Sequence, residues 1–192
     1  MPNSENFLPQ RGNYRNLIAF QKSECIYDVT VLFTRKYLSK GDRTVDQMVQ
    51  AARSGKQNIA EGCAASTTSR ETEIKLLNVA KASLQELLLD YEDYLRINNL
   101  VQWNVDNPRL SKLRTICTNN NASAYYRGIF DKCDGEMVCN LAITLIHQTD
   151  VFLRKLIDRA KADFLQEGGV REQMTRGRLN YRRSINDKNK EV

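Results

Sequence analysis

Apolar residues recur at three- and four-residue steps along four long segments of the chain, which is the spacing of one face of an α-helix. The pattern predicts helices over about 16–38, 44–63, 69–98 and 137–166. With only three prolines and nine glycines in 192 residues, these segments contain few helix breakers. The sequence therefore favours an all-α protein.

Each predicted helix has one apolar stripe. The stripes are Leu17, Phe20, Tyr27, Val31 and Leu38 (interrupted by Glu24); Val45, Met48, Val49, Ala52 and Ile59; Ile74, Leu77, Ala80, Leu84, Leu87, Leu88, Tyr91 and Leu95; and Val138, Leu141, Leu145, Thr149, Phe152, Leu156 and Ala160. Gly55 interrupts the second stripe at a cost of about 1 kcal/mol relative to alanine, which predicts a close approach of another helix. Four such helices bury their stripes economically in an antiparallel up-down-up-down four-helix bundle.

Capping signals mark the ends of the helices. Thr68 followed by Glu71 is a capping-box pattern, and Gly168-Gly169 predicts the end of the fourth helix. Pro108 after Asp106-Asn107 predicts the start of a short helix through Ile116. The predicted organisation is a polar segment 1–15, a bundle 16–169 with a helical insertion in the connector 99–136, and a basic tail 170–192 without apolar periodicity.

Composition excludes several classes of protein. The apolar fraction is 41% and the charged fraction 27%, values typical of soluble globular proteins. The sequence has no apolar run of membrane-spanning length and a polar N-terminus, so we expect a cytoplasmic protein with no membrane partner. Five cysteines at irregular spacings predict reduced thiols.

The net charge of +6 is unevenly distributed. Residues 35–56 contain six basic and two acidic residues, the tail contains seven and three, and the third helix contains four and six. Clustered lysine and arginine predict a sequence-independent nucleic-acid surface for RNA or DNA, although solvated helix faces would give the same counts. The candidate phosphate-binding residues are Arg35, Lys36, Lys40, Arg43, Arg53, Lys56, Arg171, Arg176, Arg178, Arg182 and Arg183.

Residues for catalysis or metal binding are sparse, and we expect no enzyme, cofactor or metal. His147 is the only histidine, and Cys139 lies about 12 Å from it along the same helix. The cysteines Cys117, Cys133 and Cys139 form no C-x2-C pair for zinc, and the sequence contains no phosphate-loop motif. The acidic residues Glu86, Asp90 and Asp93 share a helix face, which favours a solvated or subunit-pairing surface over a cation site or acid-base chemistry.

Two segments carry a family resemblance. They are Arg53-Ser-Gly-Lys-Gln-Asn-Ile-Ala-Glu-Gly62 and Lys75-x-Leu77-x-x-Ala80-x-x-Ser83-Leu84-x-Glu86-Leu87. Over about 18–100 the chain resembles the four-helix-bundle proteins of ribosomal RNA intervening sequences, a family that includes the accessory variability determinant of diversity-generating retroelements. The connector and the arginine tail depart from that pattern.

The resemblance implies a small basic bundle that forms ring-like pentamers. It implies binding to nucleic acid and to a reverse transcriptase through basic residues, with Arg53 and Lys56 as first candidates here. Asn58, Glu61 and Gly62 match the motif and would order the end of the second helix. The leading hypothesis is a non-enzymatic nucleic-acid-binding accessory protein and homo-oligomer. The alternative is a scaffold that docks an acidic protein partner without touching nucleic acid.

Overall fold

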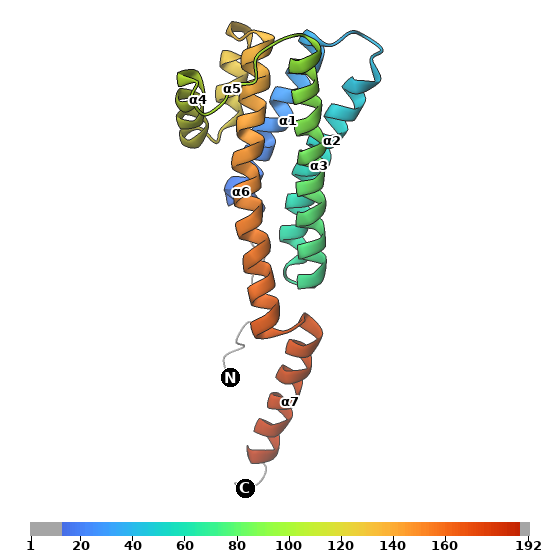
Figure 1. The fold of residues 1–192 in the computed structure, drawn as a ribbon. Helices are drawn as coiled ribbons and strands as arrows, with labels where there is room; N and C mark the ends of the chain where they lie inside the picture. Colours follow the sequence, from blue (N-terminus) through green and yellow to red (C-terminus); the bar gives the residue numbers. More distant parts are fainter. Residues whose placement is uncertain (1–12, 189–192) are drawn as a thin grey trace.

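The computed structural model describes residues 13–188, which contain helices and connecting turns and no β-strand (Figure 1). The polar segment predicted over 1–15 lies almost wholly outside these residues. The helices are η1 (Tyr14–Asn16), α1 (Ile18–Tyr37), α2 (Arg43–Ala65), α3 (Arg70–Ile97), α4 (Pro108–Asn119), α5 (Ser123–Ile129), η2 (Phe130–Lys132), α6 (Gly135–Glu167) and α7 (Val170–Lys188). The chain is therefore all-α, as predicted.

Short polar side chains determine where most of the helices begin. Immediately before four of the helices, an Asp, Ser or Asn side chain accepts a hydrogen bond from a backbone N–H in the first turn, which satisfies a donor with no partner inside the helix. These caps are Asp42 for α2, Ser69 for α3, Asn107 for α4 and Asp134 for α6. The capping box predicted at Thr68 is wrong by one residue, because Ser69 accepts from Thr72 N while the Thr68 hydroxyl donates to the Ala65 carbonyl.

Each of the four long helices packs against two others. The pairs are α1 with α2, α2 with α3, α3 with α6, and α6 with α1. In the α2–α3 contact, a Cβ on Gly55 would lie 2.7 Å from Leu84 Cδ2, so the predicted close approach at Gly55 is confirmed. The two short helices pack on this core, α5 against α1 and α4 against α6.

The stripe predicted for the first helix is wrong. Of its members only Phe20 is buried, while Tyr27 and Val31 are half-buried. The buried face instead includes Ile26, Phe33 and the polar Thr30, whose hydroxyl lies 2.9 Å from the Tyr91 hydroxyl. The third stripe is confirmed from Leu77 to Leu95, whereas Phe152 and Leu156 of the fourth are only half-buried.

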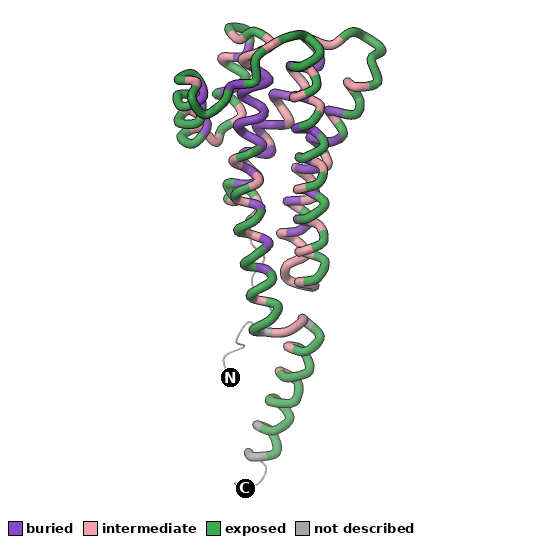
Figure 2. Tube along the Cα trace, viewed as in Figure 1, coloured by how far each residue is buried: buried purple, intermediate pink, exposed green. Residues whose placement is uncertain are grey.

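The two ends of the molecule differ in how completely they are covered. At one end every residue of α6 from Val138 to Ile146 is buried, because α1, α3, α4 and the connector surround this stretch (Figure 2). We call this the wrapped end, which consists of residues 33–46 and 91–146. At the other, open end, which consists of residues 62–73 and 160–188, Leu165 is 83% exposed.

The described part of the basic tail, residues 170–188, is a helix. α6 stops at Gly168, whose φ of 75° confirms the predicted glycine stop, and α7 begins two residues later. We expected no apolar periodicity here, yet Met174, Tyr181 and Ile185 lie at steps of seven and four residues and share a helix face. α7 extends beyond the open end (Figure 1). No helix among the described residues is long and apolar enough to cross a membrane.

Candidate nucleic-acid interface

A cleft of about 430 Å³ lies at the wrapped end, where α4, η2 and the start of α6 meet the connector. Its apolar lining comes from Trp103, Leu113, Ile116 and Met137, and its cations are Arg109, Lys112 and Lys132. The Arg109 guanidinium carbon lies 5.7 Å from the centre of the Trp103 ring. The cleft thus combines an apolar floor with three positive charges.

Two side chains of α6 hold the connector in place beside the cleft. Asn140 accepts from Trp103 N at 2.8 Å and donates to the Val101 carbonyl at 2.9 Å. Glu136 accepts from Val101 N at 3.0 Å and from Trp103 Nε1 at 2.9 Å. All four bonds join residues more than thirty positions apart, so the cleft has a fixed shape.

The hydrogen bonds to Glu136 also favour the charged, carboxylate form of its side chain. The N–H groups of Val101 and Trp103 lower the pKa of the Glu136 carboxyl, in that order of effect, and Arg109 adds a smaller electrostatic contribution. Asp134, another acid at the cleft, accepts from Met137 N at 2.8 Å as the cap of α6. Backbone and indole donors therefore engage both carboxylates, and the three cations make no ion pair with a described residue.

The predicted residue Lys36 borders this cleft. Its Nζ lies 3.4 Å from the Cys133 carbonyl and 5.4 Å from the centre of the Phe130 ring. The Tyr37 hydroxyl donates to the same carbonyl at 2.7 Å, which fixes the end of α1 against η2. Lys36 thereby links the predicted α1–α2 residues to the cleft.

The remaining predicted residues fall into three groups. Arg35, Lys40 and Arg43 are exposed at the wrapped end, at or beside the α1–α2 turn. Arg53 and Lys56 lie about 15 to 20 Å farther along α2, and Lys56 Nζ packs 4.1 Å from the Tyr27 ring centre. The tail residues Arg171, Arg176, Arg178, Arg182 and Arg183 are exposed on α7, at the opposite end of the molecule (Figure 1). The structure therefore does not unite the predicted residues in one surface.

Sequence reasoning missed the cations of the cleft. Residues 108–133 contain five basic residues, Arg109, Lys112, Arg114, Arg127 and Lys132, and one acid, Asp131. This local excess of four equals that of each predicted basic segment, so the charge count of the connector is the signal that identifies these residues.

The motif residues Asn58, Glu61 and Gly62 do not end α2, which continues to Ala65. Asn58 Nδ2 donates to the Ser54 carbonyl at 2.9 Å, and the Ser54 hydroxyl lies 2.9 Å from that of Ser83 on α3. Gly62 is buried against Leu77, whereas Glu61 is exposed. Asn58 and Gly62 thus belong to the α2–α3 contact.

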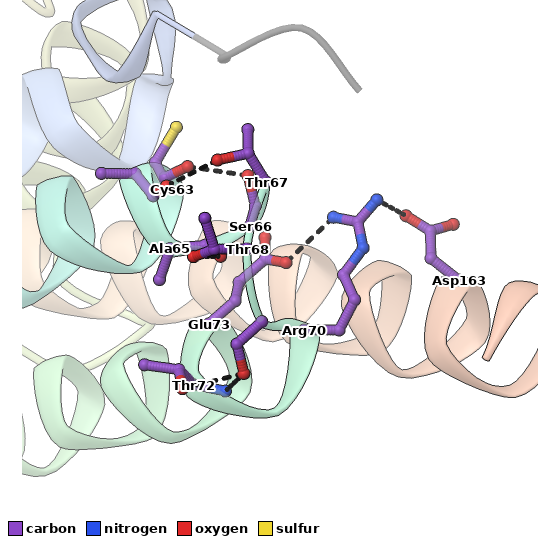
Figure 3. Close-up of polar contacts among 11 residues, drawn as sticks. Cys63, Ala65, Ser66, Thr67, Thr68, Arg70, Thr72, Glu73 and Asp163 are labelled. Carbon is purple, nitrogen blue, oxygen red and sulfur yellow. Dashed lines mark hydrogen bonds and ion pairs between the residues drawn. The ribbon is translucent and has the colours of Figure 1, made fainter. Parts of the chain in front are cut away.

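A second cleft, of about 280 Å³, lies at the open end, between the α2–α3 turn and α6. Its Arg70 pairs with Glu73 at 3.0 Å and with Asp163 at 3.7 Å (Figure 3). The Ser66 hydroxyl donates to the Cys63 carbonyl, so it belongs to the turn. Glu73 and Asp163 of this cleft both engage Arg70, so the cleft fastens α3 to α6; Arg159 also lines it and makes no ion pair with a described residue.

Other candidate chemistry is dispersed in the structure. His147 is exposed, and no group of three His, Cys, Asp or Glu residues among residues 13–188 is placed to hold a metal ion. Partial burial raises the pKa of the Asp90 carboxyl, and the negative charges of Glu86 and Asp93 add to the effect. The acidic face of α3 thus carries unrelieved repulsion between like charges.

No protein-family model, curated protein or solved structure matches this chain. The candidate interface therefore rests on the geometry and charge described above.

Proposed function

We propose that this protein is a non-enzymatic nucleic-acid-binding accessory protein that binds RNA or DNA through its wrapped end. The observation that carries the proposal is the cleft in which Arg109, Lys112 and Lys132 surround an apolar floor without an acidic partner among the described residues. Lys36 extends this positive charge toward the α1–α2 turn and its exposed Arg35, Lys40 and Arg43.

The chemistry of the cleft suits a flexible single strand. Lysine and arginine neutralise phosphates without reading sequence, and an apolar or aromatic floor accommodates the face of any base. Arginine also forms paired hydrogen bonds with phosphate oxygens. Because the cations and the apolar side chains of the cleft can contact any nucleotide, we expect little preference for sequence and a preference for unpaired bases over duplex.

The finer architecture and assembly are part of the proposal. The cyclic packing of α1, α2, α3 and α6 supports an antiparallel four-helix bundle in which α4 and α5 form an insertion. The resemblance to the ribosomal RNA intervening-sequence and retroelement accessory proteins supports a ring-like homo-oligomer. Native mass spectrometry tests this directly, and a protein that remains a monomer would remove the oligomer from the proposal.

The test of nucleic-acid binding is fluorescence anisotropy of labelled single-stranded RNA, single-stranded DNA and duplex DNA across a salt series. Lys112→Glu with Lys132→Glu removes two cleft cations, and Lys155→Glu with Lys161→Glu makes the same change of charge on exposed α6 positions. We expect the cleft variant to bind at least tenfold more weakly and to lose about two units from the slope of log affinity against log salt.

Equal losses in the two variants would show that only the total charge matters and would contradict a site at the cleft. Absence of binding by the parent protein at about 50 mM salt would contradict the nucleic-acid proposal as a whole. In that case salt-dependent binding to an acidic protein, such as a polymerase-like enzyme, would support the scaffold function instead.

A further inference from the structure

α7 presents a face that combines apolar and positively charged side chains. Met174, Tyr181 and Ile185 are 51%, 67% and 40% exposed and share one side of the helix. Arg171, Arg178 and Arg182 form a row along the border of this stripe, at the same steps of seven and four residues. These three arginines make no ion pair with another described residue. Packing of the apolar face against another protein surface would stabilise an amphipathic helix of this kind.

The outer face of α3 has the complementary character. Val79 and Leu89 are 47% and 53% exposed; Val79 lies in line with Glu86 and Asp90 along the helix, and Leu89 lies to one side of that line. Glu86 and Asp90 border Leu89, and neither makes an ion pair with another described residue, whereas Asp93 pairs with Arg96 at 2.7 Å. The face is therefore both partly apolar and negatively charged.

The two faces match in spacing as well as in charge. Arg178 and Arg182 are four residues apart, as are Glu86 and Asp90, and one such step spans about 6 Å along a helix. Partial burial and, to a smaller extent, the charges of Glu86 and Asp93 raise the pKa of Asp90, so two cations facing Glu86 and Asp90 would stabilise the pair of carboxylates. The charge and the spacing of the α7 face therefore match those of an acidic helix face such as that of α3.

The distances along the helices prevent the two ion pairs from forming together within one chain. Asp163 of α6 lies level with Arg70 at the start of α3, so α7 begins at or beyond that level. Arg178 and Arg182 are about 12 and 18 Å along α7 from its first residue, whereas Glu86 and Asp90 are about 24 and 30 Å along α3 from Arg70. If α7 folded back onto its own bundle, Arg178 would lie about 12 Å short of Glu86, and Arg182 about 12 Å short of Asp90.

We propose that α7 of one copy docks along the outer face of α3 of a second copy. In this contact Arg178 and Arg182 pair with Glu86 and Asp90, and the stripe of Met174, Tyr181 and Ile185 covers Val79 and Leu89. The inference deepens the homo-oligomer of the proposed function by naming the surfaces that join its subunits. It assigns the tail arginines to assembly, while the cleft binds nucleic acid.

The test is sedimentation velocity of the full chain over a concentration series, without nucleic acid. Arg178→Glu with Arg182→Glu reverses the charge of the tail, and Glu86→Lys with Asp90→Lys reverses the charge of the α3 face. Each variant alone places like charges opposite each other, so we expect self-association to weaken at least tenfold. The Lys155→Glu, Lys161→Glu variant should associate as the parent does.

The decisive measurement combines the two charge reversals in one chain. In this quadruple variant each tail again faces an α3 surface of opposite charge, whatever the number of subunits, so association should return to within about threefold of the parent, a margin set by the context dependence of ion pairs. A quadruple variant that stays dissociated would overturn the proposal, and so would a parent that is monomeric at every concentration. An oligomer that persists in both separate variants would overturn this contact and leave the oligomer of the proposed function intact. Failure of nucleic-acid binding would not affect any of these results.

Discussion

The clefts at the wrapped end and at the open end both contain cations and carboxylates, but the carboxylates have different partners in the two. At the open end Arg70 contacts two carboxylates, and the cleft is a fastening between α3 and α6. At the wrapped end Glu136 and Asp134 accept from N–H groups. The neighbouring cations form no ion pair with them and can therefore contact an external partner. A cleft with lysine and arginine thus becomes a binding site only where the nearby acids are already engaged elsewhere.

The two ends of the molecule also differ in how far other helices surround α6. At the wrapped end, short helices and the connector pack around α6, which is buried without interruption from Val138 to Ile146, while the open end continues into α7. The wrapped end is suited to hold a ligand in a fixed geometry. The open end is suited to make contacts that depend on a second molecule.

The largest expected effect compares one residue from each end. Trp103 is 7% exposed in the core of the wrapped end, and Leu165 is 83% exposed at the open end. Trp103→Ala should lower the free energy of unfolding by about 3–5 kcal/mol, because it leaves a cavity and removes the bond to Glu136. Leu165→Ala should change it by less than about 0.5 kcal/mol. Urea unfolding measures both, and similar losses would contradict the difference in coverage.

A smaller effect is expected at Gly55, where it reports how tightly α2 and α3 pack outside the wrapped end. At Gly55 a Cβ would lie 2.7 Å from Leu84 Cδ2, so Gly55→Ala should cost about 1–3 kcal/mol. At Gly128, in α5, a Cβ would meet no atom within 4 Å, and Gly128→Ala should be neutral or stabilise by up to about 1 kcal/mol. Thermal unfolding of the matched pair gives the answer. A neutral Gly55→Ala would mean that α2 and α3 separate easily.

The smallest effect concerns the acid that holds the connector. Because the folded state lowers the pKa of Glu136, its carboxylate stabilises the fold above the ordinary glutamate pKa of about 4.3. This stability is lost as the pH falls through the lower, folded-state pKa. The stability difference between the parent and Glu136→Gln, expected to be under about 1 kcal/mol in this partly solvated site, should therefore shrink below about pH 4.

Unfolding curves at pH 7 and in acid measure this difference. Glu61→Gln, on an exposed position of α2, is the matched control and should behave as the parent at both values. A Glu136→Gln difference that is independent of pH would mean that the two N–H bonds do not depend on the carboxylate charge.

The sequence predicted the positions of the four long helices α1, α2, α3 and α6 and of the short helix α4 because their signals are local, whereas it did not predict α7. The cap at Asn107, the proline after it and the glycine at 168 all act within one turn of the chain. The one misplaced cap, Thr68 instead of Ser69, shows the limit of this reasoning. Two adjacent hydroxyl residues are equivalent in a pattern, and the turn geometry chooses between them.

The buried face of α1 could not be predicted because its polar members find partners far along the chain. Lys22 is 1% exposed, and its Nζ donates to the Cys117 carbonyl at 2.6 Å and to Gln148 Oε1 at 2.9 Å. Polarity patterns assign a lysine to the surface, since they contain no information about residues 95 and 126 positions away. The prediction of the candidate site was incomplete for the same reason. Charged residues can be counted along the sequence, but their arrangement in space depends on how the connector folds.

The junction at Gly168 makes the side of α7 on which the arginine row lies sensitive to the number of residues that follow the junction. Its φ of 75° with ψ of −175° belongs to a region that only glycine occupies readily, and α7 starts two residues later. Inserting or deleting one residue within α7 before Arg178 would rotate the arginine row by about 100° relative to the junction. Lineages of this protein should therefore tolerate substitutions on the outer side of α7 far better than changes in its length.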